Sequence, residues 1–131
     1  MIVLDASAAV AVLLNLGENA RVIGDRMNGT DGEVHVPHLF EIEVLSALRR
    51  RMIGSPRPER SAQFVEDLTS MRLTRYPHTA LLPRIWELRH NITTYDAAYV
   101  ALAETLDAPL VTLDARLSQA PGIRAAVELY Q

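Results

Sequence analysis

Two aspartates in this sequence each follow a short run of apolar residues. Asp5 comes directly after residues 1–4, and Asp114 comes after the stretch LVTL at residues 110–113. A carboxylate at the end of a buried strand either caps the helix that follows, by accepting bonds from free backbone N–H groups, or belongs to a site. Carboxylate oxygens suit Mg²⁺ and Mn²⁺, so several acids together can hold a cation that activates water for hydrolysis.

Further acids fall on helical stretches. Asp96 comes three residues after Thr93, which is also a favourable place for a negative charge in the first turn of a helix. Glu41 and Glu43 lie in HLFEIEVLSALRRRM, whose apolar residues form one wide arc at about 100° per residue. Glu41 falls inside that arc and Glu43 on its polar side, so periodicity does not choose between the two glutamates.

The elements that must position these acids follow from hydrophobic periodicity and turn signals. Turns are expected at NGTDGE (28–33) and SPRP (55–58). The predicted strands are residues 1–4, 34–37, 73–76, 110–113 and 126–129, and the predicted helices are residues 6–14, 18–27, 38–52, 59–71, 79–89, 94–106 and 116–119. Strands separated by helices imply a mainly parallel sheet covered on both faces. In such sheets the functional crevice lies at the carboxyl ends of the strands, where Asp5 and Asp114 stand.

The composition narrows the class of protein. The chain has 131 residues, of which 49% are hydrophobic and 22% charged, so we expect one folded domain over residues 1–131. It has no cysteine, which excludes disulfides, thiolate metal sites and a cysteine nucleophile. The apolar stretch AAVAVLLNL follows no basic residue and is shorter than the roughly 20 residues of a membrane span. We therefore expect a cytoplasmic protein with no export signal and no membrane association.

The net charge of −3 does not mark a nucleic-acid binder, but the distribution of charge is informative. All 13 basic residues are arginine, and Arg49, Arg50 and Arg51 are consecutive. The planar guanidinium donates two bonds to a phosphate at once. The alternative is a biased genome composition combined with a solvated helix end.

Three blocks of sequence, in this order and in a chain this short, resemble PIN-domain ribonucleases, specifically the VapC-type toxins of type II toxin–antitoxin systems. The blocks are VLDASA, VPHLFEIEVLSALRR and TTYDAAYVALAETLDAPLVTLDARL. The resemblance implies a PIN-like three-layer α/β/α domain with a mainly parallel central sheet. It covers nearly the whole chain, although residues 53–75 carry no signature.

The resemblance also implies the residues that do the chemistry. The family's metal-binding and catalytic acids fall on Asp5, Glu43, Asp96 and Asp114. It selects Glu43 over Glu41, because the family's glutamate directly precedes Val-x-x-Ala-Leu-Arg. Crowded carboxylates repel one another and resist ionising, so such a cluster is costly as architecture but suited to Mg²⁺ or Mn²⁺.

Other positions have supporting roles by the same resemblance. Ser7 and Thr112 match hydroxyl residues near the site. The arginines at 49–51 and Arg116 are candidate contacts to the RNA backbone, although Arg116 can equally be a solvated helix residue. Tyr95 and Tyr99 flank Asp96 and can stack on bases, but tyrosines at helical spacing more often pack. Trp86 is assigned to the core or to a dimer surface.

The family pattern further implies an RNA substrate, a cognate antitoxin and a homodimer. Two rival α/β classes also place an aspartate after the first strand: phosphoreceiver domains and haloacid-dehalogenase-type phosphatases. Both rely on a lysine, and this chain has none. The remaining alternative is a PIN-like binding module with weak or no nuclease activity, against which the complete set of acids argues.

Overall fold

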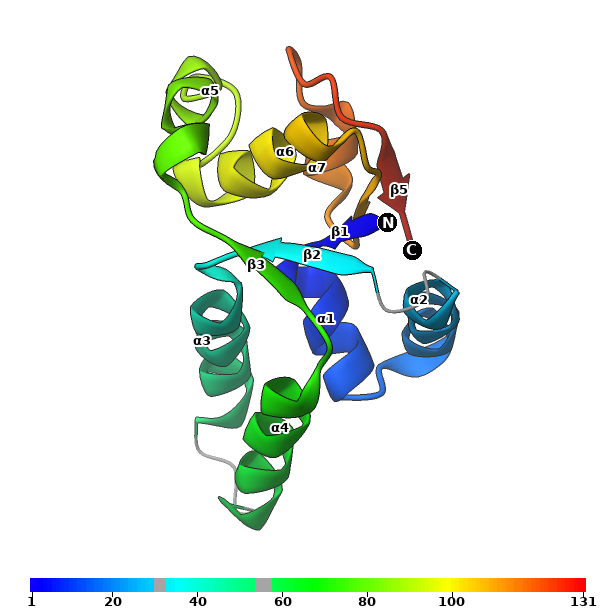
Figure 1. Ribbon diagram of the computed structural model, residues 1–131. Coiled ribbons are helices and arrows are strands. Elements are labelled where there is room, and N and C mark those ends of the chain that lie inside the picture. Colours follow the sequence, from blue (N-terminus) through cyan, green and yellow to red (C-terminus); the bar gives the residue numbers. More distant parts are fainter. Residues whose placement is uncertain (30–32, 54–57) are drawn as a thin grey trace.

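The computed structural model in Figure 1 describes residues 1–29, 33–53 and 58–131, with only the backbone described for residues 58–60. The predicted turns NGTDGE and SPRP lie largely outside the described residues. The strands are β1 (Ile2–Leu4), β2 (Val34–Pro37), β3 (Thr74–Tyr76), β4 (Leu110–Thr112) and β5 (Val127–Leu129). The helices are α1 (Ala6–Leu13), α2 (Gly17–Asn28), α3 (Phe40–Met52), α4 (Pro58–Ser70), the 3₁₀ turn η1 (Thr79–Leu81), α5 (Leu82–Glu87), α6 (Thr94–Leu106) and α7 (Ala115–Gln119).

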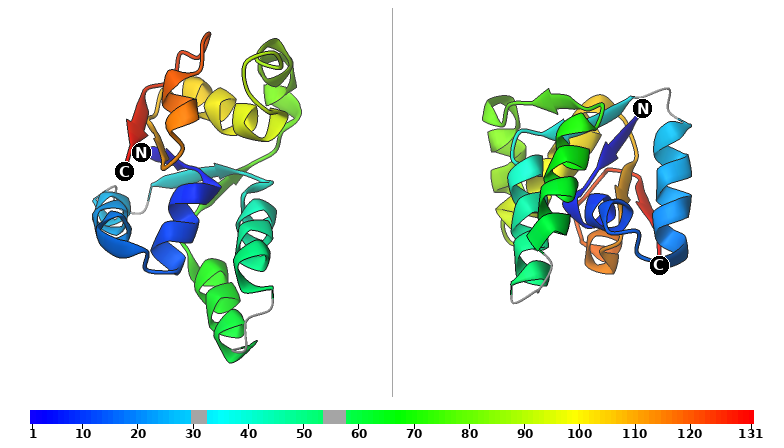
Figure 2. Two further views of the ribbon diagram at one scale, coloured as in Figure 1. Left: turned by 180° about the vertical axis from the view of Figure 1, so that it is seen from behind. Right: turned by 90° about the horizontal axis from the view of Figure 1, so that it is seen from below.

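The five strands form one sheet in the order β3-β2-β1-β4-β5, and all four neighbouring pairs are parallel. Helices α1 to α4 lie on one side of the sheet and α5 to α7 on the other, as the views in Figures 1 and 2 show. The predicted three-layer α/β/α fold with a parallel sheet is therefore confirmed.

The central strands are buried on both faces, which explains their unbroken apolar sequences. Ile2, Val3 and Leu4 of β1 are each 0% exposed, as are Leu110 and Val111 of β4. Because β1 and β4 are adjacent and parallel, their carboxyl ends meet at one edge of the sheet. That edge carries Asp5 and Asp114, each directly or closely after its strand.

Helix α6 is buried along seven consecutive residues, Ala97–Ala103. Four of these are alanines, which let the helix lie close to the sheet, and a helix that is apolar on all sides is expected in a core. Thr93 caps its N-terminus by accepting a bond from the Asp96 N–H at 3.1 Å. The cap fixes where α6 begins, and the buried residues that follow hold the helix against the core.

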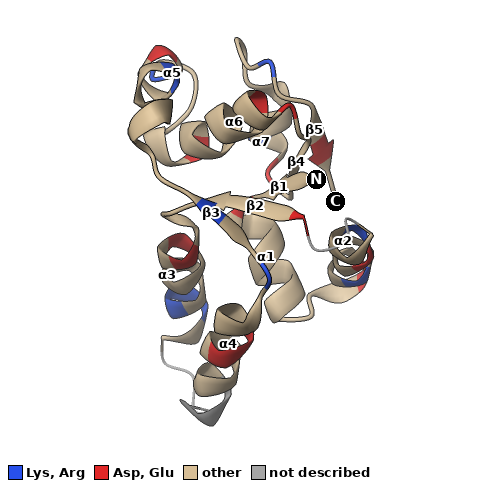
Figure 3. Cartoon of the chain, viewed as in Figure 1, with Lys and Arg blue, Asp and Glu red and all other residues tan. Residues whose placement is uncertain are grey.

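Helix α3 is amphipathic, and it buries Phe40, Val44 and Leu48 at helical spacing. Figure 3 shows acidic residues at its start and basic residues at its end. This arrangement matches the helix dipole, which favours negative charge at the N-terminus and positive charge at the C-terminus.

The predicted helix over residues 79–89 is divided into η1 and the short helix α5. Pro83 lies in the first turn of α5, where its missing N–H is not needed, so it starts a new helix there. No helix in the described ranges is both long and apolar enough to cross a membrane.

A partly buried ion pair fastens α5 to α6. Arg84 donates to both carboxylate oxygens of Glu104, at 2.7 and 3.0 Å, and also to the carbonyl of Gly122 at 2.8 Å. The N–H of Arg124 donates to the same carboxylate at 2.7 Å. Burial alone would raise the pKa of Glu104, but Arg84 and this N–H outweigh it and hold the pKa below its ordinary value.

Replacing Arg84 by methionine should lower the free energy of unfolding by about 1–3 kcal/mol, because Glu104 then keeps a partly desolvated charge without its main partner. Urea denaturation measures this effect. In the wild type the pair's contribution is complete above pH 4.5, the ordinary pKa of a glutamate, and is lost as the pH falls through the lower folded value. Arg21→Met, which removes an exposed pair with Glu18, is the matched control and should change stability little. A loss at Arg84 no larger than that of the control would contradict the assignment.

Candidate metal-binding active site

Asp5 is held in one orientation at the end of β1 by three hydrogen bonds. Ser7 Oγ and the Ala8 N–H donate to its Oδ1 at 2.7 and 3.0 Å, and Thr112 Oγ1 donates to Oδ2 at 2.5 Å. The residue is only 4% exposed. Asp5 therefore caps α1, and at the same time it lines a cleft.

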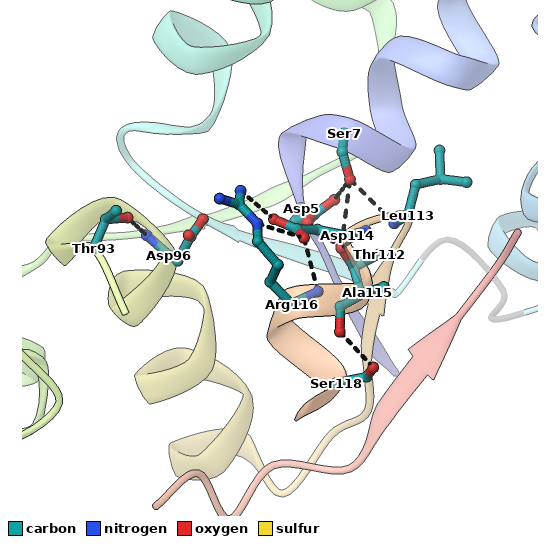
Figure 4. Close-up of polar contacts among 10 residues, drawn as sticks. All are labelled: Asp5, Ser7, Thr93, Asp96, Thr112, Leu113, Asp114, Ala115, Arg116 and Ser118. Carbon is teal, nitrogen blue, oxygen red and sulfur yellow. Dashed lines mark hydrogen bonds and ion pairs between the residues drawn. The ribbon is translucent and has the colours of Figure 1, made fainter. Parts of the chain in front are cut away.

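The two hydroxyl residues join the ends of β1 and β4, as Figure 4 shows. Ser7 Oγ accepts a bond from the Leu113 N–H at 3.1 Å, and Thr112 Oγ1 accepts one from the Asp114 N–H at 2.9 Å. Each hydroxyl thus donates to Asp5 and accepts from the backbone after β4. Backbone bonds such as the Asp5 N–H to the Val111 carbonyl set the register of β1 and β4. Ser7 and Thr112 add side-chain bonds where the two strands end.

All four acids expected from the sequence line one cleft of about 460 Å³. They come from the end of β1, the start of α3, the start of α6 and the end of β4, and they are Asp5, Glu43, Asp96 and Asp114. Glu41 is not among the lining residues. It pairs instead with Arg75 of β3, whose Nε lies 2.8 Å from its carboxylate.

Three of these acids resist ionisation. Burial raises the pKa of Asp5, Glu43 and Asp96, in each case as the largest cause, although hydrogen-bond donors partly offset it. The negative charge of a neighbouring acid raises each pKa further, with Asp96 acting on both Asp5 and Glu43. Carboxylates that are partly dehydrated and face one another favour the binding of a cation.

Asp114 is in a different environment. It caps α7 by accepting from the Arg116 N–H at 2.9 Å, and the Arg116 guanidinium donates to both of its oxygens at 3.1 and 2.9 Å. These bonds hold the pKa of Asp114 below its ordinary value. In the view of Figure 4 the guanidinium lies between Asp114 and Asp96, and its charge also opposes the rise in the pKa of Asp96.

The donor set fits a hard cation, because it consists of carboxylates supported by hydroxyls. As the side chains lie, however, no three acidic or histidine side chains in the described part of the chain are grouped closely enough to hold one ion.

Residues 2–123 match the family model of the PIN domain. The chain belongs to the PIN-domain family. This PIN domain is 46% identical to Ribonuclease VapC9 of Mycobacterium tuberculosis over 122 residues, which are 90% of this chain and 89% of that protein. It is 40% identical to Ribonuclease VapC1 of the same organism over 131 residues, covering 98% and 97% of the two chains. The resemblance to VapC-type proteins is thereby confirmed.

Solved structures share the fold of this PIN domain. VapC20 of Mycobacterium tuberculosis, a sarcin–ricin loop cleaving toxin, aligns with a TM-score of 0.68 at 18% identity, covering 94% of this chain and 96% of that chain. VapBC2 of Rickettsia felis, bound to a DNA fragment from its promoter, aligns with a TM-score of 0.69 at 18% identity over the whole of both chains.

The arginines expected to contact RNA have different positions relative to the acidic cleft. Arg50 and Arg51 line the acidic cleft, whereas Arg49 is exposed on α3 and does not. Arg116 is bound to Asp114.

Tyr99 was expected either to pack or to stack on bases, and its burial at 1% exposure excludes stacking. It nevertheless lines the cleft, which the sequence argument did not anticipate. The available signal was its spacing of three residues from Asp96, which puts both on one face of α6.

Replacing Glu43 by glutamine should raise the midpoint of thermal unfolding of the metal-free protein by about 2–5 °C at neutral pH, because it removes a charge that burial and repulsion disfavour. Since the folded pKa of Glu43 is raised, its ionisation costs stability as the pH rises through that value. The advantage of the variant should therefore shrink as the pH falls towards 4.5. Thermal scans in chelator test this, with the exposed Glu66→Gln as control. A lower midpoint for Glu43→Gln would contradict the account.

Proposed function

We propose that this chain is a metal-dependent endoribonuclease that cleaves RNA phosphodiester bonds and acts as the toxin of a toxin–antitoxin pair. The observation that carries the proposal is the cleft lined by four acids, at the carboxyl edge of a parallel sheet, in a chain 46% identical to Ribonuclease VapC9. Acids that raise one another's pKa are unfavourable for folding, so a function is the better explanation of their meeting.

Asp5, Glu43 and Asp96 would hold Mg²⁺ or Mn²⁺, and Asp114 would join them on leaving Arg116. When bound, the ion lowers the pKa of a coordinated water and offsets the charge that develops on the phosphate. The rigid support of Asp5 by three donors keeps its oxygens in place without help from the ion. The guanidinium released from Asp114 would be free to bind phosphate.

An acidic cleft repels RNA, so positive groups at its border must bind the backbone. Arg50 and Arg51 are suited to this, because they line the same cleft as the acids. Contacts of arginine with phosphate give affinity and salt dependence rather than choice of sequence.

Asp5→Asn and Asp96→Asn should each abolish RNA cleavage in Mg²⁺ or Mn²⁺ while the protein remains folded, because each removes one charge of the cation site. Cleavage of structured RNA by the purified proteins measures this, with circular dichroism as the check on folding. Asp67→Asn, on the exposed face of α4, should cleave like wild type. Unimpaired cleavage by Asp5→Asn would contradict the proposed mechanism. RNA binding without cleavage by the wild type would favour the alternative, a PIN-like binding module.

The double variant Arg50→Ala/Arg51→Ala should bind RNA more weakly and with a smaller salt dependence. Each lost phosphate contact on a single strand reduces the slope of log K against log salt by about 0.7. Binding is measured by fluorescence anisotropy across salt concentrations, in the Asp5→Asn background to prevent cleavage. Arg49→Ala is the matched control, because it is adjacent in sequence and outside the cleft. Equal effects of the control and the double variant would refute the assignment.

The proposed setting is the cytoplasm, with a cognate antitoxin as partner, and the relationship to VapC proteins supports this. A homodimer is also proposed. Helices α3 and α5 each expose two large apolar side chains, Ile42 and Leu45 on α3 and Leu82 and Trp86 on α5. Trp86 is 62% exposed, so of its two expected locations the core is excluded, and a dimer surface stays a proposal.

A further inference from the structure

The hydroxyl of Tyr99 is a buried polar group without a hydrogen-bond partner among the described residues. Two other side-chain atoms in those parts of the chain share this condition, on His35 and Glu41. Each of those side chains has a second polar atom that is bonded, to Tyr76 and Arg75 respectively. Tyr99 has one polar atom, and it is the unpartnered one.

The fold gives no reason for this hydroxyl. Burying a hydroxyl without a partner costs about 1–3 kcal/mol, and phenylalanine would fill the same space without that cost. Tyr99 is 1% exposed, so the hydroxyl cannot rely on bulk water either. A buried polar group that does not serve packing needs another explanation.

The position of the side chain supplies one. Tyr99 lies one turn after Asp96 on α6 and lines the cleft together with Asp5, Glu43 and Asp96. Among these acids it interacts most strongly with Glu43 and more weakly with Asp5 and Asp96. The hydroxyl thus faces Glu43, although no well-formed hydrogen bond joins the two.

Glu43 lacks a well-placed hydrogen-bond donor that would orient its carboxylate. Asp5 is held by three donors, whereas the donor next to the Glu43 carboxylate in the described part of the chain is the Tyr99 hydroxyl, which partly offsets the rise in the pKa of Glu43 without forming a hydrogen bond of ordinary geometry. A carboxylate that binds a metal is normally oriented by a further hydrogen bond. The side chain of Glu43 is long and flexible, so it needs such a bond more than Asp5 does.

We propose that Tyr99 is a positioning residue, whose hydroxyl donates to the Glu43 carboxylate once a cation draws that carboxylate into place, and so fixes its direction towards the cation. This inference rests on the proposed metal-dependent function. Tyr99 is not assigned a contact with the substrate, because its side chain is only 1% exposed. Its role is to help hold the Glu43 side chain in one conformation, so that the cation does not have to restrict that side chain alone.

The test is Tyr99→Phe, measured by Mn²⁺ titration calorimetry and by thermal unfolding in chelator, so that neither readout depends on RNA cleavage. We expect Mn²⁺ affinity to fall about 10-fold, as is typical for loss of a group that orients a ligand. We expect the unfolding midpoint to stay the same or rise, because an unpartnered buried hydroxyl is removed.

Tyr76→Phe is the matched control. Its hydroxyl lies 2.6 Å from His35 Nδ1, at a place where β2 meets β3 and outside the acidic cleft. Its loss should lower the unfolding midpoint and leave Mn²⁺ affinity unchanged. The two variants therefore have opposite expected signatures, although each removes one oxygen atom.

A third comparison tests whether Tyr99 acts through Glu43. In the Glu43→Gln background, Tyr99→Phe should change Mn²⁺ affinity less than twofold. A full 10-fold loss in that background would overturn the inference, as would an affinity of Tyr99→Phe alone within twofold of wild type. Those results leave the proposed function intact, whereas a wild-type protein that binds no Mn²⁺ overturns the metal-dependent function and this inference with it.

Discussion

The hydrogen bonds of Asp5 with Ser7 and Thr112 are the contact on which the site depends. Asp5 follows a strand that is completely buried, so its carboxylate enters a poorly solvated region and must find donors there. The two hydroxyls meet this need and also accept from the backbone beyond β4. The same few bonds therefore solvate the acid, cap α1 and hold the two central strand ends together. The start of α7 and the position of Asp114 follow from that junction.

The other acids are brought to this junction by helices whose burial leaves them little freedom. Helix α6 is fixed by its seven buried residues and by the Thr93 cap, and it delivers Asp96 and Tyr99 from one face. Helix α3 is fixed by its apolar stripe and delivers Glu43. The packing of these helices holds the carboxylates together although they repel one another. This repulsion lowers the stability of the fold, and such a loss of stability is often found where a site is preorganised for function.

Much of this arrangement could be predicted from the sequence. Asp5 and Asp114 could be recognised because each follows an apolar strand, and Asp96 because it follows the helix cap Thr93. These signals lie within a few residues of each acid. The choice between Glu41 and Glu43 was not local. The structure separates the two glutamates through Arg75 of β3, which is 34 residues from Glu41 in the sequence and pairs with it. Periodicity cannot contain that information, and only the family pattern selected Glu43.

The same limit applies to the arginines and to Tyr99. Three consecutive arginines cannot be told apart by residue type. Only the orientation of α3 in the fold shows that Arg50 and Arg51 line the cleft and that Arg49 does not. Tyr99 has the spacing of a packing residue, and burial confirms that it packs. The missing partner of its hydroxyl is visible only when every neighbouring donor and acceptor is known.

The placement of opposite charges along α3 has a consequence for the electric field inside the cleft. Glu43 and Arg50 are seven residues apart, which is two helical turns and about 10 Å along the helix axis. Both line the same cleft, together with Asp5 at the end of β1 and Arg51 beside Arg50. The cleft is therefore polar along its length, with carboxylates that attract cations near the strand ends and guanidinium groups that attract anions towards the end of α3.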